Sequence, residues 1–219
     1  MPPDATKDRL LDAAEACFAE AGYAATSLRA ITTKAKVNLA AVSYHFGGKE
    51  ALYLAVFARR IDPVNRERLE RLAALEAAHA DRTLPLEGLL DAFLRPALQL
   101  AQTAEGQDFM RIVGRMSAEA APLCRRIDRC FDAVKARYLA ALQRALPGHS
   151  LAELFWRGHF MVGAMLHTMS DTWRLREMSN GLCDPGDVDG VLRRLVPFVA
   201  AGLRSQTLAA SPATAGATP

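Results

Sequence analysis

The stretch TSLRAITTKAKVNLAAVSYHFGGK, residues Thr26–Lys49, decides the fold, because it predicts two short helices joined by a tight turn. The first helix should span about 27–35. Either Thr26 or Ser27 can cap it, since a hydroxyl oxygen accepts hydrogen bonds from the free N–H groups of the first turn. Apolar residues recur within it at three- and four-residue spacing, which places them on one buried face: Leu28, Ile31 and Ala35.

The second helix of this segment should run from Leu39 to Phe46, after the turn Lys36–Asn38 and with Asn38 as its N-cap. A helix of eight residues, rising about 1.5 Å per residue, is roughly 12 Å long, about the width of a DNA major groove. Val42 and Phe46 are expected to face the interior. Small and polar residues remain on or near the outer side: Ala40, Ala41, Ser43, Tyr44 and His45.

The charge of this segment indicates a nucleic-acid partner. The whole chain carries only +3, yet residues 21–49 contain four basic residues and no acidic one. Cations supply phosphate contacts, and small residues let a helix approach base edges. The alternative is an ordinary helix pair with solvated lysines. The candidate DNA contacts are Thr26, Ser27, Arg29, Lys34, Lys36, Asn38, Leu39, Ala40, Ser43, Tyr44, His45 and Lys49.

The run YHFGGKEAL, residues 44–52, follows this helix pair, and together they resemble the DNA-binding domain of TetR/AcrR transcriptional regulators over roughly residues 6–57. The resemblance implies an all-α homodimer that binds a palindromic double-stranded DNA operator, usually as a repressor released by a small molecule. We expect a three-helix helix-turn-helix domain over 6–52 and a larger helical effector-binding and dimerisation domain over 53–205. The uncharged tail, 206–219, is expected to be disordered.

The remaining helices are predicted from apolar periodicity and from Gly, Pro or Asn breaks. Gly22 should end the first helix. The pair Asp62-Pro63 should kink or restart the fourth, because proline cannot donate to the preceding turn. The expected helices cover about 7–21, 49–61, 66–80, 85–102, 106–118, 122–146, 150–178 and 185–205.

Composition and motifs argue against other classes of protein. Hydrophobic residues make up 51% of the chain and charged residues 23%, which predicts a sizeable core. The four cysteines lack metal-binding spacing, and neither a signal peptide nor a membrane span is indicated. We therefore expect a cytoplasmic protein with no metal and no cofactor. Ser170, His167 and Asp171 occur near one another, but one helix cannot assemble a catalytic triad from them, so no enzyme is expected.

The last two long helices are apolar around much of their circumference, and such a helix must be buried on several sides. One side can face the domain core and the other a second copy, which forms an isologous four-helix interface. The alternative is that both helices are central in the core of the monomer. The candidate interface residues are Leu154, Val162, Leu166, Val191, Leu195 and Phe198.

The second domain also contains many large apolar side chains, several of them methionines, which adapt to ligands of variable shape. An apolar cavity with one or two polar anchors would suit an amphipathic ligand such as an acyl chain with an anionic head. The alternative is an ordinary core. The candidate ligand contacts are Phe109, Arg111, Val113, Met116, Phe131, Tyr138, Trp156, His159, Phe160 and Met165.

Four segments resemble the PsrA-type branch of the family, which implies a fatty acid or acyl-CoA effector and control of lipid-oxidation genes: Val37–Val42, Phe109–Arg111, Glu153–Met161 and Leu195–Gly202. The chain departs from that branch at Ser43, where asparagine is usual, and within 164–176. Two alternatives stay open. The same kind of regulator could respond to another apolar molecule, or the protein could be a helical lipid carrier without regulatory output.

Overall fold

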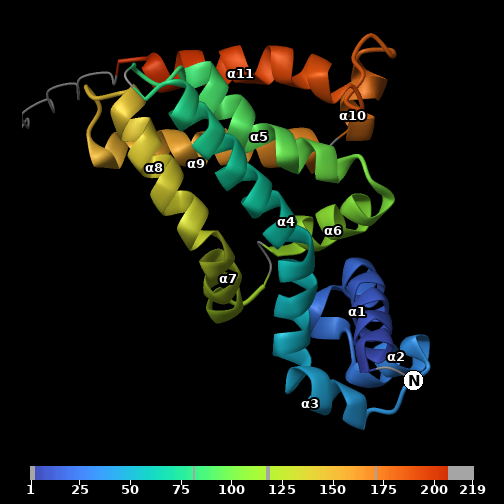
Figure 1. Ribbon diagram of the computed structural model, residues 1–219. Coiled ribbons are helices and arrows are strands. Elements are labelled where there is room, and N and C mark those ends of the chain that lie inside the picture. Colours follow the sequence, from blue (N-terminus) through green and yellow to red (C-terminus); the bar gives the residue numbers. More distant parts are fainter. Residues whose placement is uncertain (1–2, 81, 117–118, 171, 207–219) are drawn as a thin grey trace, which may run out of the picture.

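The computed structural model describes residues 3–80, 82–116, 119–170 and 172–206. Within these ranges the regular elements are all helices, in a small N-terminal group beside a larger bundle (Figure 1). The predicted all-α fold, with a helix-turn-helix unit followed by a helical domain, is confirmed. The tail expected to be disordered lies, from residue 207 on, outside the described residues.

The N-terminal group contains α1 (Pro3–Ala25), α2 (Leu28–Ala35) and α3 (Ala40–Phe46). Gly22 takes φ 77° and ψ 172° and kinks α1, but helical structure resumes beyond it, so α1 is longer than predicted. The hydroxyl of Thr26 donates to the carbonyl of Gly22 over 2.7 Å and so secures the end of α1. Ser27 is therefore the residue that caps α2, accepting a 3.1 Å hydrogen bond from the Ala30 N–H.

Helix α4 (Lys49–Ala78) joins the N-terminal group to the bundle as one 30-residue helix (Figure 1). It continues through Pro63, where a kink or restart was predicted. A proline removes one backbone donor, and α4 buries apolar side chains both before and after this position, including Phe57, Ile61, Val64 and Leu72. Packing on both sides accounts for its continuity. A shift of α4 in the bundle would therefore move its N-terminal end.

The helices that follow α4 in the chain differ in length. The predicted helix 122–146 is interrupted by a 3₁₀ turn, and the described parts of the predicted helix 150–178 are helical on both sides of residue 171, which lies outside the described residues. No helix in the described ranges combines the length and apolarity needed to span a bilayer. The elements are α5 (Leu86–Ala101), α6 (Ala104–Arg115), α7 (Ala121–Asp128), η2 (Arg129–Phe131), α8 (Asp132–Ala145), α9 (Leu151–Ser170), α10 (Thr172–Met178) and α11 (Val188–Arg204).

Two hydrophobic cores hold the chain together. The bundle core lies between the second half of α4 and helices α5, α8, α9 and α11. The N-terminal core contains side chains of α1–α4, but α6 and α7 also contribute to it, through Phe109, Ile112, Leu123 and Ile127. The rings of Phe57 and Phe109 meet edge to face with centroids 4.8 Å apart. Helices α6 and α7 therefore bridge the bundle and the helix-turn-helix unit.

Candidate functional site

The turn between α2 and α3 fixes the geometry of the helix-turn-helix segment. Lys36 adopts the left-handed conformation at φ 54° and ψ 48°, and its N–H closes the end of α2. The side-chain oxygen of Asn38 accepts a 2.9 Å hydrogen bond from the Ala40 N–H and so secures the start of α3. Ile31 and Val42 are fully buried and anchor the two helices in the N-terminal core. The outer face of α3 is thus held by packing beneath it.

The outer face of α3 and its flanks are accessible. Tyr44 is 82% exposed and Leu39 is 44% exposed, while Ala40 and Ser43 are also exposed. His45 and Ala41 are half-buried. The exposed cations on and directly after α2 are Arg29, Lys34 and Lys36. They form no ion pair with any described residue, so their charge is available to an anionic partner.

Two predicted DNA contacts have internal partners. The Thr26 side chain is buried and donates its hydroxyl to carbonyls of α1, so it stabilises the fold instead of reaching the surface. The Lys49 ammonium lies 4.5 Å from the centroid of the Tyr23 ring and donates to the Ala24 carbonyl over 3.3 Å. Lys49 therefore holds the start of α4 against the end of α1, and its remaining donors can still face solvent.

The predicted ligand contacts do not gather at one place. Phe109 is buried in the N-terminal core, and Val113, Met116 and Phe131 pack at its edge. Arg111 is exposed and pairs with Asp108 over 2.7 Å. Helix α9 turns its methionine face to the bundle core and its aromatic face outward, which places Trp156, His159 and Phe160 on the exposed side. Only Tyr138 and Met165 lie in the bundle core.

A buried arginine that the sequence analysis missed lies beside Tyr138 and Met165. Arg68 is only 2% exposed, and the Tyr138 hydroxyl donates to its carbonyl oxygen over 2.8 Å. Its guanidinium Nη2 lies 3.6 Å from the Met165 sulfur. The charged pairs around it suggested a solvated helix face. The usable signal was the spacing of Ile61, Val64, Arg68 and Leu72, which places Arg68 on the inward stripe of α4.

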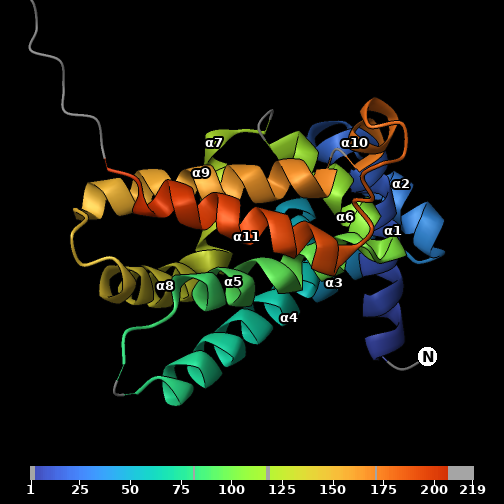
Figure 2. The same cartoon turned by 90° about the horizontal axis from the view of Figure 1, so that it is seen from above.

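The predicted interface residues divide between the core and the surface. Leu154 and Leu195 are buried in the bundle core, while Val162, Leu166 and Val191 are half-buried against it. Phe198 alone of the six is well exposed, at 71%. Helices α9 and α11 lie side by side (Figure 2). The two helices carry the exposed apolar side chains Leu151, Phe155, Trp156, Phe160 and Phe198, and their outward-facing surface is here called the α9/α11 face.

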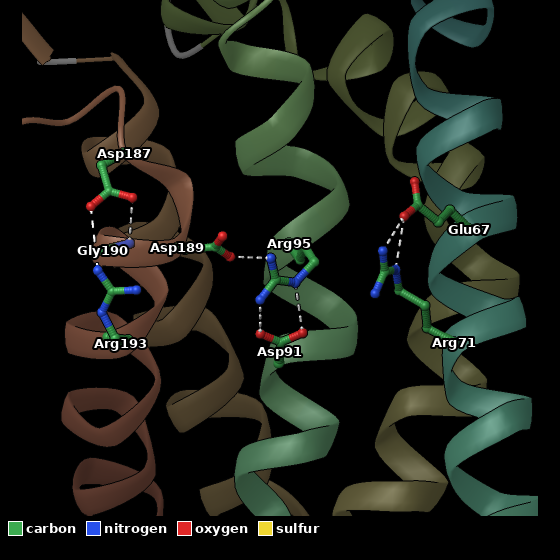
Figure 3. Close-up of polar contacts among 8 residues, drawn as sticks. All are labelled: Glu67, Arg71, Asp91, Arg95, Asp187, Asp189, Gly190 and Arg193. Carbon is green, nitrogen blue, oxygen red and sulfur yellow. Dashed lines mark hydrogen bonds and ion pairs between the residues drawn. The ribbon is translucent and has the colours of Figure 1, made fainter.

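Three arginines on the outside of the bundle, Arg71, Arg95 and Arg193, are paired with carboxylates (Figure 3). Arg95 of α5 contacts Asp91 over 2.8 Å and Asp189 of α11 over 2.6 Å. These ion pairs raise the pKa of Arg95 and lower that of Asp189. A shallow depression beside them is lined by both charged and apolar side chains. In the described part of the chain, no cluster of His, Cys, Asp or Glu is arranged to hold a metal ion.

Sequence comparisons match an N-terminal and a C-terminal region of the chain to models of one family. The model for bacterial regulatory proteins of the tetR family matches residues 10–56. The model for the tetracyclin repressor-like C-terminal domain matches residues 91–202. The chain is 43% identical over 47 residues to the probable HTH-type transcriptional regulator YttP of Bacillus subtilis (strain 168). That match covers 22% of this chain and only 23% of YttP, so it concerns one domain.

Solved structures share the fold over nearly the whole chain. A TetR-like transcriptional regulator from Rhodococcus sp. RHA1 has a TM-score of 0.62 at 19% identity, covering 92% of this chain and 97% of that one. The SmeT–triclosan complex has a TM-score of 0.62 at 25% identity, covering 90% and 91%. HlyIIR, a hemolysin II transcriptional regulator, has a TM-score of 0.55 at 20% identity, covering 90% and 97%. With its helix-turn-helix surface and both family matches, the chain belongs to the TetR family of bacterial regulatory proteins.

Proposed function

We propose that this DNA-binding regulator is a homodimeric repressor of lipid or fatty-acid metabolism genes, released from a palindromic operator by a fatty acid or acyl-CoA. The observation that carries the DNA-binding part is the outer face of α2 and α3, where Arg29, Lys34 and Lys36 have no carboxylate partner among the described residues. Such cations supply phosphate affinity, while the small residues of α3 admit base edges.

The α9/α11 face supports the homodimer. Phe155 and Phe160 of α9 are 60% and 62% exposed, and Phe198 of α11 is 71% exposed. Large apolar side chains exposed on two neighbouring helices are typical of an interaction surface. Packing the face on itself about a twofold axis would bury it in both copies. A twofold dimer also matches a palindromic operator, because it presents two α3 helices to two half-sites about one DNA turn apart.

We further propose that residues 6–52 form the DNA-binding domain and that residues 53–205 form the effector-binding and dimerisation domain. Helix α4 runs through both, so an effector among α4, α5, α8 and α9 could tilt α4 and change the spacing of the two α3 helices. An effector can shift this equilibrium only by its difference in affinity for the two states. The methionine-lined inner face of α9 supports an apolar effector.

A second candidate effector class is favoured by one comparison. The similar SmeT structure contains triclosan, so a regulator of this family that responds to another apolar molecule is the alternative to a lipid response. A helical lipid carrier without regulatory output is a weaker alternative, because it gives no role to Arg29, Lys34 and Lys36, which have no carboxylate partner among the described residues.

The test is binding of the purified protein to its own upstream DNA, titrated with palmitate and with palmitoyl-CoA. Release of specifically bound DNA by either compound supports the lipid-responsive repressor. Specific binding that neither compound changes would refute the lipid effector and leave the regulator with another apolar ligand. Acyl binding without any specific DNA binding would instead favour the lipid carrier.

A further inference from the structure

The Arg68 guanidinium lies in the bundle core without a carboxylate partner in the described part of the chain. Its Nε donates to the Phe93 carbonyl over 2.8 Å, and its Nη1 donates to the side-chain oxygen of Asn65 over 3.3 Å. Its Nη2 is directed at the Met165 sulfur, 3.6 Å away, and a thioether is a weak acceptor. A buried cation is thus satisfied only in part.

Among the described residues, one further arginine is buried, and it is held differently. Arg157 contacts the Glu153 carboxylate over 3.2 Å and donates to the Gly202 carbonyl over 2.6 Å, which ties α9 to the end of α11. The surface arginines of Figure 3 also have carboxylate partners. Burying a charge without a counter-charge is costly. A fold that retains Arg68 in the bundle core therefore suggests a use for its charge.

The side chains around Arg68 suit an amphipathic ligand. The Phe93 ring centroid lies 4.1 Å from the guanidinium carbon, and Tyr138 packs edge to face on Phe93 at 5.0 Å. Burial lowers the pKa of Arg68 to about 10, so the side chain stays charged at neutral pH. Three methionines continue from this point along one buried face of α9, at successive turns: Met161, Met165 and Met169. Their flexible side chains can make room for an alkyl chain.

We propose that Arg68 is the anchor of the effector site, and that it binds the carboxylate of a free long-chain fatty acid whose alkyl chain displaces the methionines of α9. This inference rests on the lipid response proposed above and narrows it. A carboxylate supplies the missing counter-charge and can accept two parallel hydrogen bonds from a guanidinium. A CoA ester offers only a neutral thioester carbonyl at that position, and its large polyanionic head is too strongly solvated for the bundle core.

The position of Arg68 also connects the anchor to the helix-turn-helix unit. Asn65, the partner of Arg68, donates to the Cys130 carbonyl in η2 over 2.8 Å. Directly before η2, α7 places Leu123 and Ile127 in the N-terminal core. A carboxylate that draws Arg68 away from Asn65 would disturb the residue that is hydrogen-bonded to η2. Because η2 directly follows α7, this change can reach an element that contacts the DNA-binding unit.

The test is calorimetric binding of laurate, palmitate, palmitoyl-CoA and the neutral analogue dodecanol to the full chain and to three variants. Arg68→Met removes the charge and Arg68→Lys retains it. The control, Arg71→Met, lies on the same helix but removes a half-buried arginine paired with Glu67. Wild type, Arg68→Lys and Arg71→Met should bind both acids, with Arg68→Lys weaker than wild type because it lacks the bidentate fork. Arg68→Met should bind them about 10- to 100-fold more weakly, with dodecanol affinity unchanged.

Several results would overturn the anchor. These are equal affinity of Arg68→Met and wild type for the acids, tighter binding of palmitoyl-CoA than of palmitate, or no binding of either acid. If the melting curve shows that Arg68→Met does not fold, the test is the ratio of laurate affinity to dodecanol affinity in the wild-type protein. A ratio near one refutes the proposal. DNA binding is measured on the same samples. Its absence would refute the regulator while leaving a carboxylate site at Arg68 standing.

Discussion

Arg126 of α7 reaches Glu50 in the first turn of α4, with a guanidinium nitrogen 2.6 Å from a carboxylate oxygen. Two further contacts join the same regions. The Tyr23 N–H donates to the Glu119 carboxylate over 3.1 Å, and Arg115 donates to the Glu20 carbonyl over 3.0 Å. The segment from α6 to α7 therefore contacts the helix-turn-helix unit through polar bonds as well as through the N-terminal core.

Replacing Arg126 by Gln should affect communication more than stability. The two side chains of its ion pair are 51% and 42% exposed, so the free energy of unfolding should change by less than about 1 kcal/mol. The ratio of operator affinities without and with palmitate should fall toward one. Arg137→Gln breaks a comparable surface pair with Glu76 and serves as control, with the ratio unchanged. Equal ratios for Arg126→Gln and wild type would contradict the role of α7.

Lys34→Gln and Lys36→Gln should each weaken operator binding and lower its salt dependence. Each removes one cation without a carboxylate partner among the described residues. The slope of log affinity against log salt should therefore decrease by about one per substitution. Lys135→Gln is the control, because Lys135 of α8 already pairs with Asp128. The measurement is a fluorescence anisotropy titration at several salt concentrations, and slopes that match the control would argue against a phosphate contact.

Thr26→Ala should destabilise the fold by about 1–2 kcal/mol, because it removes a buried hydroxyl and leaves the Gly22 carbonyl with one partner fewer. Thr26→Ser retains the hydroxyl and should recover most of the loss. Urea unfolding measures both. At temperatures where the variants are folded, operator affinity should equal that of wild type. A folded Thr26→Ala with strongly reduced operator affinity would restore Thr26 as a direct DNA contact.

Phe160→Glu and Phe198→Glu should shift the protein toward monomer, because each places a charge on the α9/α11 face, where the native side chains are 62% and 71% exposed. Sedimentation velocity should then show a species near 23.8 kDa. Leu182→Glu, at a position 90% exposed between α10 and α11, should leave the dimer intact. If both phenylalanine variants sediment as wild type does, the α9/α11 face is not a dimer interface.

The affinity for laurate should depend on pH through Arg68. Burial lowers the pKa of Arg68 to about 10, so its charge is lost as pH rises through that value. Laurate affinity should be steady between about pH 7 and 9 and decline by about one order of magnitude per unit above about pH 10. In the unfolded chain the Arg68 guanidinium keeps its proton to a higher pH than in the folded chain. The contribution of Arg68 to folding stability therefore rises as pH increases above about 10. A laurate-to-dodecanol ratio that does not vary with pH would exclude the anchor.

Local signals in the sequence predicted much of the fold. The Thr26–Lys49 segment combines helix caps with apolar spacing, and the predicted all-α architecture follows from similar patterns along the chain. The break at η2, 129–131, contains neither Gly nor Pro, so tertiary packing decides it. Continuity through Pro63 likewise depends on the apolar contacts of α4.

The candidate sites were harder to predict for a related reason. Helix α9 is apolar on opposite sides, and periodicity alone cannot tell which side faces the core. Trp156 and Phe160 were therefore predicted as ligand contacts, whereas the structure places them on the outer face. Arg68 lies among charged neighbours that do face solvent, and only its register on α4 distinguishes it.

The most direct test of operator binding through α2 and α3 is a footprint of the purified protein on its upstream DNA, repeated with a variant that combines Tyr44→Ala with Lys34→Gln. We predict two protected half-sites about 10 base pairs, one helical turn, apart. Both should be lost in the double variant, while its melting curve is unchanged. Protection that persists in the folded double variant, or no protected site in wild type, would contradict this prediction.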